Sequence, residues 1–472
     1  MTDPAAKPPL FVDLDGTLIK TDSLLESVLK LTKRNPLFLL LYPFWLMQGR
    51  AGFKQQVAKR VSLAGSEVPV NEEFHEFLRQ QQDRELILIS ASNQKAVDEL
   101  AQNFDLFASC IGSSAGLNLR GHNKLEKIQQ LCEKNGFAYA GNSSVDLPIW
   151  EQASEVLMVN CPPYLRSQLS ATASVQEFDA PLPWFSQLLK AMRPHQWLKN
   201  GLLFVPLILA HQANDIGLLA QATIAFISFS LCATSVYLLN DLMDLDADRQ
   251  HRQKKNRPFA AGTLSLQLGI GVHFLLLLTA FALAFILPAG FVTVLLGYWV
   301  LTVLYTVVLK RILLLDLIVL AQLYTIRLVA GAAAVSVVAS PWLLGFSMAL
   351  FFSLGIVKRV TELINADNGG KKLPGRAYRS DHRRLLTLIG TVCSLLTVTT
   401  VGFYINSEEA MRLYSKPMML WPICILLFLI LYRLWGFALG GKLEEDPVLF
   451  AISDHPSQVA TVLMFLVLYL AI

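Results

Sequence analysis

Long apolar runs fill the second half of this chain, and they constrain its fold more than any other feature. From residue 198 onward nine stretches are candidate membrane-spanning helices: 198–213, 217–239, 266–287, 289–309, 313–335, 340–357, 385–405, 417–437 and 457–472. A spanning helix needs about 20 mostly apolar residues, so the first and last are short. Residues 1–195 instead have the mixed composition of a soluble domain. We therefore expect a soluble domain at 1–180 and an all-α bundle of nine transmembrane helices at 181–472.

Basic residues alternate between the loops, which predicts the orientation of this bundle. The loops after the second, fourth, sixth and eighth spans hold most of the Lys and Arg, including Lys254 and Arg383, whereas the opposite loops hold only Arg412 and Lys416. Because Lys and Arg are enriched in cytoplasmic loops, we expect a multi-pass protein of the inner (plasma) membrane with a cytoplasmic N-terminal domain. A net charge of +4 is too small to predict nucleic-acid binding.

An acid-rich segment follows the second span. In Asn240-Asp241-Leu-Met-Asp244-Leu-Asp246-Ala-Asp248, the carboxylates of Asp241, Asp244 and Asp248 share one stripe of a continuing helix. Such carboxylates repel one another unless a cation lies between them, and Mg²⁺ prefers oxygen ligands and bridges to phosphates. Cations that could neutralise a diphosphate follow directly: Arg249, His251, Lys254, Lys255 and Arg257. The segment predicts a Mg²⁺–diphosphate site, and the alternative is a solvated charged loop.

Other ionisable residues interrupt the later apolar segments. Asp316 and Arg327 lie in the fifth span, and Lys358, Arg359 and Glu362 end the sixth. Charge at membrane depth is costly and usually faces a polar cavity, which makes these residues candidates for a site. Two structural alternatives stand beside this interpretation: an Arg327–Asp316 ion pair, and plain cytoplasmic anchoring by Lys358 and Arg359.

The segments 240–248 and 257–262, followed by Tyr305 and Lys310, resemble the UbiA superfamily of intramembrane prenyltransferases over residues 193–472. This resemblance implies nine spans around a cavity that opens to the cytoplasm. Aromatic prenyltransferases carry a second Asp-x-x-x-Asp cluster after the fourth span, which this chain lacks. Its segments 315–331 and 358–362 are instead similar to the decaprenyl-phosphate phosphoribosyltransferase branch. Enzymes of that branch transfer ribose 5-phosphate from phosphoribosyl diphosphate onto a polyprenyl phosphate.

The resemblance implies roles for these residues. Asp241, Asp244 and Asp248 would hold Mg²⁺ and the diphosphate. The expected substrate contacts are Asn240, Lys254, Arg257, Lys310, Asp316, Arg327, Lys358, Arg359 and Glu362, of which Lys358 and Arg359 would hold the attacking lipid phosphate. Two alternatives remain: an aromatic prenyltransferase that uses a polyprenyl diphosphate, and a non-catalytic carrier or scaffold for a phosphorylated lipid.

The N-terminal domain carries a second set of motifs. The sequence predicts buried strands at 10–15, 86–89 and 137–140, and polar side chains follow each strand. Parallel strands bring such side chains to one edge of a sheet. The order Asp13-x-Asp15, Ser90, Lys124 and Gly141-x-x-x-x-Asp146 resembles the haloacid dehalogenase phosphatases over about 8–165.

By that resemblance, Asp13 is the nucleophile and Asp15 the general acid and base, both also in the Mg²⁺ site. Ser90 and Lys124 would hold the phosphate, and Asp146 would support the metal. Asn142 occupies a Mg²⁺ position where the family usually has Asp, so the domain is either an active phosphatase or a weak or regulatory one. The fusion suggests that it removes the 5-phosphate of the transferred ribose.

Residues 18–84 are too many for a loop, and we expect them to form a helical cap over this Rossmann-like α/β domain. Within the cap, residues 36–47 are strongly apolar yet too short to span a membrane, with Lys33, Arg34 and Arg50 at their ends. This segment is either an interfacial element that enters the headgroup layer or a buried cap helix.

Overall fold

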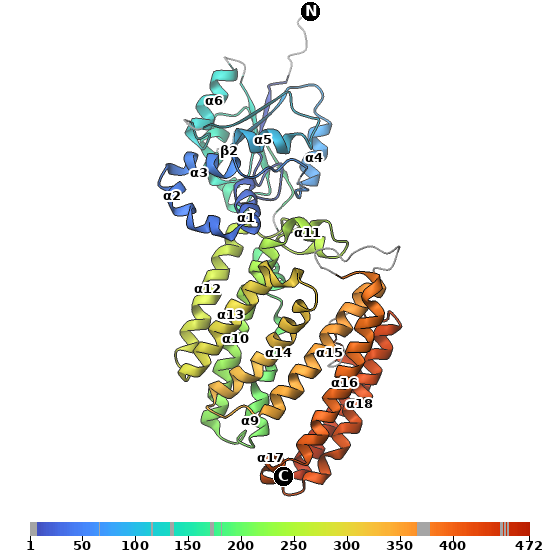
Figure 1. The fold of residues 1–472 in the computed structure, drawn as a ribbon. Helices are drawn as coiled ribbons and strands as arrows, with labels where there is room; N and C mark the ends of the chain where they lie inside the picture. Colours follow the sequence, from blue (N-terminus) through green and yellow to red (C-terminus); the bar gives the residue numbers. More distant parts are fainter. Residues whose placement is uncertain are drawn as a thin grey trace, which may run out of the picture. The chain divides into compact units, whose positions relative to one another are not determined.

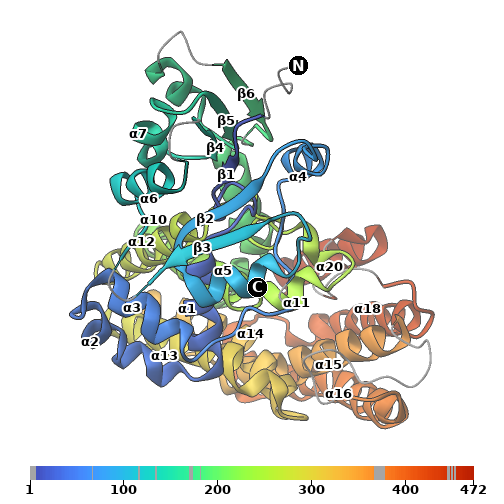
Figure 2. The ribbon, with the colours of Figure 1, turned by 90° about the horizontal axis from the view of Figure 1, so that it is seen from above.

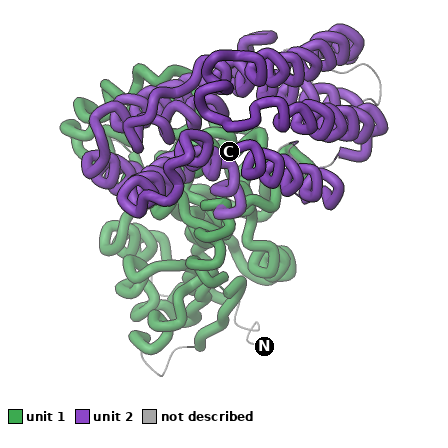
Figure 3. The backbone as a smooth tube through the Cα atoms, turned by 90° about the horizontal axis from the view of Figure 1, so that it is seen from below, with its two compact units in different colours: residues 1–193, 237–274 green, residues 194–236, 275–472 purple. Residues whose placement is uncertain are grey.

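The computed structural model describes residues 7–65, 67–114, 117–132, 136–169, 174–180, 182–365, 378–443, 447, 450 and 453–472. The chain forms two compact units, one of residues 1–193 with 237–274 and one of 194–236 with 275–472 (Figure 3). The acid-rich segment therefore belongs to the same unit as the N-terminal residues. The expected division at residue 180 stays a prediction.

The first unit contains a six-stranded sheet in the order β3-β2-β1-β4-β5-β6, in which every neighbouring pair is parallel (Figure 2). The strands are β1 (Leu10–Val12), β2 (Leu86–Asn93), β3 (Ser109–Ser113), β4 (Ala138–Gly141), β5 (Glu155–Val159) and β6 (Ser174–Phe178). The three expected strands are β1, β2 and β4, and they form the centre of the sheet. The strand order reverses beside β1, which is where open α/β sheets place their sites.

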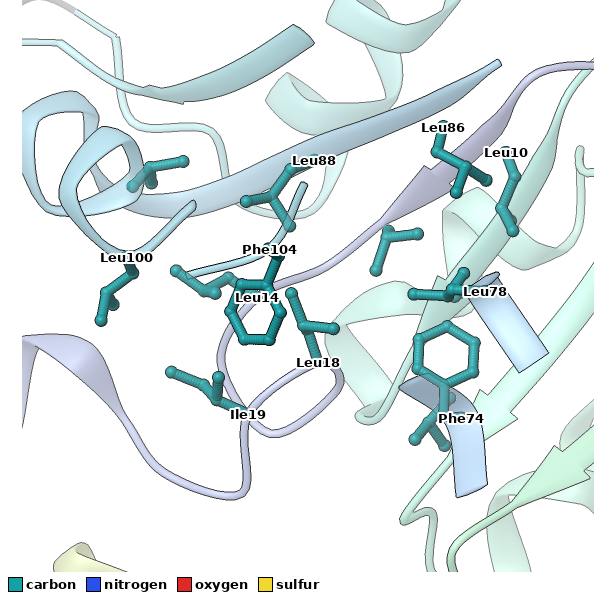
Figure 4. Packing of buried hydrophobic residues seen from close by; sticks show 14 of the residues in the cluster. Leu10, Leu14, Leu18, Ile19, Phe74, Leu78, Leu86, Leu88, Leu100 and Phe104 are labelled. Carbon is teal, nitrogen blue, oxygen red and sulfur yellow. The ribbon is translucent and has the colours of Figure 1, made fainter. Parts of the chain in front are cut away.

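Side chains alternate between the two faces of this sheet. Leu10 of β1 packs on one face with Phe74 and Leu78 of α4 (Glu72–Arg79) (Figure 4). Phe11 packs on the other face with Ile128 of α6 (His122–Cys132). The first face is also covered by α5 (Gln94–Ala101) and the second by α7 (Leu147–Trp150). This arrangement confirms the predicted α/β domain.

A helical cap follows β1 and is shorter than expected. It consists of α1 (Ser23–Arg34), the 3₁₀ helix η1 (Pro36–Leu40), α2 (Tyr42–Leu46) and α3 (Gly49–Ala58) (Figure 1). Because Phe74 and Leu78 complete the sheet core, α4 belongs to the sheet layer although the predicted cap extends to residue 84. The unit also contains η2 (Ser144–Asp146), η3 (Pro163–Gln168), α8 (Trp184–Met192), α11 (Leu245–Arg249) and η5 (Lys254–Asn256).

Seven helices among the described residues are long and apolar enough to cross a membrane. They are α10 (Ile216–Met243), α12 (Leu266–Ala284), α13 (Ala289–Val307), α14 (Leu315–Ala334), α15 (Pro341–Asn365), α16 (Arg383–Ile405, preceded by η7, Ser380–His382) and α18 (Trp421–Leu439, preceded by η8, Pro417–Leu420). Each corresponds to one predicted span. In the second unit α13 to α16 pack in sequence, and α16 packs on α18 (Figure 1). This unit also contains the short elements η6 (Leu309–Arg311) and α17 (Glu408–Leu413).

The first and last predicted spans differ from the other seven. Residues 198–213 form a 3₁₀ helix, η4 (Pro194–Phe204), followed by the short α9 (Val205–Leu209) instead of one continuous helix. Proline at the start of α9 lacks the amide hydrogen that a continuing helix needs. The last predicted span is the 17-residue α20 (His455–Ala471). The count of nine spans therefore stays a prediction.

Candidate active sites

Two carboxylates of the acid-rich segment converge on arginines. Asp241, in the last turn of α10, is 3% exposed and accepts two hydrogen bonds of 2.6 Å from Nη2 of Arg193. Nη1 of Arg257 donates to Asp241 Oδ1 at 3.1 Å and to Asp248 Oδ2 at 2.7 Å. One guanidinium thus bridges two buried acids and offsets the repulsion that the sequence predicts.

The third carboxylate of the motif points elsewhere. The helix is interrupted at Asp244, between α10 and α11, and Nζ of Lys33 in α1 lies 3.1 Å from Asp244 Oδ1. The expected stripe of three acids on a continuing helix is therefore divided: Asp241 and Asp248 share Arg257, and Asp244 pairs with the cap. Asn240 is half-buried in the same turn, and Lys254 is exposed in η5.

The acid-rich segment is bound to the cap and sheet domain by further contacts. Nη2 of Arg249 lies 2.5 Å from Glu26 Oε1 on α1, and both side chains are less than a tenth exposed. Gly262 has a positive φ of 68°, and a Cβ there would lie 2.5 Å from the Cβ of Lys20. Because removing one partner of a buried ion pair leaves an uncompensated charge, the Arg249–Glu26 pair ties the segment 237–274 to the N-terminal residues.

A second carboxylate–guanidinium cluster lies in the other unit. Nε of Arg359 on α15 donates to Asp316 Oδ2 at 3.0 Å, its Nη1 donates to Glu362 Oε2 at 2.6 Å, and Tyr378 donates its hydroxyl hydrogen to Asp316. Arg359 is 1% exposed and Asp316 is fully buried. This burial does not fit a headgroup anchor, which was the structural alternative for Arg359. Lys358, the other residue of that alternative, is half-buried.

Arg327 is held in an aromatic box. Its Nε donates to Asn200 Oδ1 at 2.8 Å and its Nη1 donates to the carbonyl of Leu323. The rings that surround its guanidinium at 5.3–5.4 Å belong to Phe229, Tyr298 and Tyr324. Asp316, the alternative partner expected from the sequence, instead pairs with Arg359. The expected contact Lys310 lies half-buried in η6.

The hydrolase motifs meet at the carboxyl ends of β1, β2 and β4. Asp13 Oδ1 lies 2.9 Å from Nζ of Lys124, and Asp15 accepts from the backbone of Ser23 at 2.8 Å and from Ser92 Oγ at 2.6 Å. Burial raises the pKa of Asp13 to about 6, although Lys124 opposes the rise. Burial likewise raises the pKa of Asp15 to about 6. Ser90, at 1% exposure, accepts from the backbone of Ser92 at 3.1 Å.

The loop after β4 places Asn142 against the first motif. Asp146 Oδ2 accepts from the backbone amides of Asn142 and Ser143 at 3.1 Å, and Asp146 Oδ1 accepts from the hydroxyl of Tyr139 at 2.9 Å. Asp146 therefore shapes the loop. A Cβ on Gly16, whose φ is 78°, would lie 2.0 Å from the Asn142 amide nitrogen, so this position needs glycine.

Both sites offer oxygen donors of the kind that Mg²⁺ binds. Within the described residues no group of three or more His, Cys, Asp or Glu side chains has the geometry to hold a metal. In the hydrolase site Asp13 and Asp15 supply carboxylates, and a neutral amide oxygen of Asn142 would complete the set. In the acid-rich turn Asp241 and Asp248 supply carboxylates whose shared partner is Arg257. Both sets consist of hard oxygen donors, as Mg²⁺ requires.

The hydrolase site opens into a cavity of about 410 Å³ that is lined in part by the segment 262–268. Asp15, Asn71, Asn142 and Trp184 are among the other residues that line it. Asn71 is fully buried, and its Oδ1 has no hydrogen-bond partner among the described residues.

Residues 202–453 match the UbiA prenyltransferase family, and residues 10–151 match the haloacid dehalogenase-like hydrolase family. The first match covers more than half of the 472 residues, so the chain belongs to the UbiA prenyltransferase family. It carries a haloacid dehalogenase-like domain at its N-terminus, as the motifs predict. The seven apolar helices and the family together make it a multi-pass membrane protein.

Relatives share both parts or one of them. The uncharacterised protein y4nM of Sinorhizobium fredii is 34% identical over 462 residues, 96% of this chain and 88% of that protein. Decaprenyl-phosphate phosphoribosyltransferase of Mycolicibacterium smegmatis is 29% identical over 287 residues, 58% of this chain and 88% of that enzyme. A UbiA homologue from Archaeoglobus fulgidus, solved with DMAPP and Mg²⁺, has 19% identity and a TM-score of 0.47, covering 60% of this chain and 98% of that one.

Proposed function

We propose that this chain transfers a phosphoribosyl group from phosphoribosyl diphosphate to a polyprenyl phosphate with Mg²⁺, and that its hydrolase domain then removes the 5-phosphate. The observation that carries the proposal is the pair of buried acids, Asp241 and Asp248, on one shared arginine. The similarity to a decaprenyl-phosphate phosphoribosyltransferase supports the choice of substrates.

In the transfer, an oxygen of the lipid phosphate attacks C1 of the ribose while the bond from C1 to the diphosphate breaks, and pyrophosphate leaves. Bound Mg²⁺ would supply positive charge for the departing oxygens. Arg193 and Arg257 are about a quarter exposed, so they can release Asp241 and Asp248 and donate to the diphosphate instead. The two acids would then hold the metal.

In the hydrolysis, Asp13 attacks the phosphorus and forms an aspartyl-phosphate, while Asp15 protonates the departing C5 oxygen of the ribose. Water then cleaves the aspartyl-phosphate, with its proton taken by Asp15. Lys124 neutralises the phosphate charge from 2.9 Å beside Asp13.

The two activities are linked through α1. This helix begins at Ser23, which bonds Asp15, and its Glu26 and Lys33 bind the acid-rich segment at Arg249 and Asp244. A product released beside that segment would need only a short transfer to the hydrolase cavity, whose wall is residues 262–268. The proposed order of reactions, transfer followed by dephosphorylation, rests on this arrangement.

The test uses the full-length protein in lipid nanodiscs with polyprenyl phosphate, phosphoribosyl diphosphate and Mg²⁺. We expect the wild-type protein to release one pyrophosphate for each lipid-linked ribose that it forms. Asp241→Asn should release no pyrophosphate. Asp13→Asn should accumulate lipid-linked ribose 5-phosphate. Asp246→Asn is the matched control, because Asp246 is an exposed acid of the same segment.

Other results would reject the proposal. Pyrophosphate release only from a prenyl diphosphate with an aromatic acceptor would make the chain an aromatic prenyltransferase. No release from either donor would make it a carrier. Wild-type dephosphorylation by Asp13→Asn would remove the hydrolase from the scheme.

A further inference from the structure

The cap carries an apolar ledge, which we define as residues 36–47. Seven large apolar side chains of the ledge are between 42% and 84% exposed: Leu37, Leu39, Leu40, Leu41, Phe44, Leu46 and Met47. Tyr42 and Trp45 of the same segment point inward and pack with Leu31, Val57 and Val61. The ledge is therefore a folded element with its own small core. Its outer face consists of the exposed apolar side chains. Soluble surfaces rarely gather so many apolar side chains.

A basic pocket adjoins the ledge. Leu31, Arg34, Asn35, Phe38, Lys59 and Arg60 line a cavity of about 590 Å³ between the ends of α1 and α3. The guanidinium of Arg60 lies 4.6 Å above the ring of Trp45, which connects the pocket to the ledge. Arg34, Lys59 and Arg60 are all exposed.

Charge in this part of the chain is one-sided. Residues 23–60 contain seven Lys and Arg and a single acid, Glu26. That acid is buried against Arg249, so it does not offset the exposed cations. An apolar face rimmed by cations is the pattern of elements that lie in the interface of an anionic membrane.

We propose that the cap docks on anionic lipid, with the ledge among the acyl chains and a lipid phosphate in the basic pocket. The ledge has cations where a protein-binding groove would have a mixed polar rim, and this favours a bilayer as the occupant. The described part of the same chain carries seven candidate spanning helices, so the cap belongs to a membrane protein. This inference does not depend on the proposed transfer reaction.

Docking would act on the hydrolase site through one helix. The twelve-residue α1 begins beside Asp15, which Ser23 bonds at 2.8 Å, and ends at Arg34 in the pocket. A cap held on lipid would fix this helix and present the cavity of the hydrolase site toward substrates carried by the same membrane.

The test places a photoreactive benzoylphenylalanine at Phe44 in the full-length protein in nanodiscs of mixed phosphatidylcholine and phosphatidylglycerol. The control site is Tyr164, an aromatic residue of the same unit with 59% exposure against 65% for Phe44. Both exchanges replace an exposed ring by a larger one, so folding is retained. Mass spectrometry should find lipid adducts at least fivefold more often at 44. Equal yields, or crosslinks from 44 to a second copy of the chain, would overturn the proposal.

A second arm tests the pocket. The triple change Arg34→Gln, Lys59→Gln and Arg60→Gln should abolish the preference of the 44 adducts for phosphatidylglycerol over phosphatidylcholine. The matched triple of exposed cations outside the cap, Lys7→Gln, Arg79→Gln and Arg166→Gln, should keep it. Excess inorganic phosphate should not remove the preference of the unsubstituted cap. If it does, the pocket binds free anions and the lipid assignment is wrong.

Discussion

The two carboxylate–guanidinium clusters of this protein have similar chemistry but differ in the burial of their cations. In the first unit the acids are buried while Arg193 and Arg257 keep 25% and 28% of their side chains exposed. In the second unit Arg359 and Asp316 are at 1% and 0%. A partly exposed guanidinium can exchange its carboxylate for a ligand at modest cost, whereas a fully buried pair cannot be opened without leaving a charge unpaired.

This difference separates exchangeable from structural ion pairs. In the acid-rich segment the carboxylates are buried and their arginine partners are partly exposed, which suits a site that binds a charged ligand. The Asp316–Arg359–Tyr378 cluster joins α14, α15 and the segment before α16, and we infer that its first task is to hold them together. Each prediction below challenges or refines this distinction.

The largest expected effect is on the stability of the second cluster. Asp316→Ala leaves Arg359 buried without that carboxylate and should lower the free energy of unfolding by about 3–5 kcal/mol. Thermal unfolding in detergent measures the loss. The double variant Asp316→Leu with Arg359→Met should recover most of it, because it buries no charge. An unchanged midpoint in the single variant would show that the pair is not structural.

The first cluster should show the opposite pattern. Arg257→Gln removes the cation shared by Asp241 and Asp248 and should lower pyrophosphate release by about 10²–10³-fold, the usual loss for one group that stabilises developing charge. Its unfolding midpoint should fall less than that of Asp316→Ala, because Asp241 keeps its two hydrogen bonds from Arg193. Arg252→Gln, which changes an exposed cation of the same loop, is the control and should release pyrophosphate normally. Loss of stability with normal release would reverse the distinction.

The hydrolase site contains a third buried ion pair, Asp13 with Lys124, and its activity should depend on pH. Both Asp13 and Asp15 have a pKa raised to about 6 by burial. The reaction needs ionised Asp13, so activity should fall as the pH drops below 6. It also needs protonated Asp15, so activity should fall as the pH rises above 6. We expect a bell-shaped profile of kcat/KM for a soluble phosphate ester, with about tenfold loss per pH unit on each side. A flat profile between pH 5 and 8 would contradict these roles.

The smallest effect concerns the pair Lys33–Asp244, whose side chains are 30% and 27% exposed. Such pairs contribute at most about 1 kcal/mol. Lys33→Gln removes one cation from the Asp244 carboxylate and should lower the Mg²⁺ concentration for half-maximal pyrophosphate release by about two- to fivefold. Lys30→Gln, on the same helix, serves as the control. A higher Mg²⁺ requirement would mean that Lys33 assists the site.

Much of this architecture could be predicted from the sequence. Apolar run length predicts seven of the spans, because a membrane imposes length and composition directly. The motif order predicts the meeting of Asp13, Asp15, Lys124 and Asn142, because strands of a parallel sheet end at one edge.

Contacts between distant segments were not predictable. Three such contacts join segments far apart in the sequence: Arg193 with Asp241, Tyr378 with Asp316, and Lys33 with Asp244. The sequence around each residue does not indicate its partner, because the contact depends on the path of the chain between them. Asn200 gave a signal that was missed: Lys199 and Asn200 are polar residues within an apolar run, the same pattern that singled out Arg327.

The contacts around Glu26 and Gly262 have a consequence for anyone who would divide this protein. A fragment that stops at residue 193 keeps every motif of the hydrolase. It lacks Arg249, the partner of Glu26, and it exposes the surface of Lys20 against which Gly262 packs. The shortened fragment would lose the cation that pairs with Glu26 and the part of the cavity lining that residues 262–268 supply. The phosphatase rate and substrate preference of the isolated domain would therefore differ from those of the intact protein.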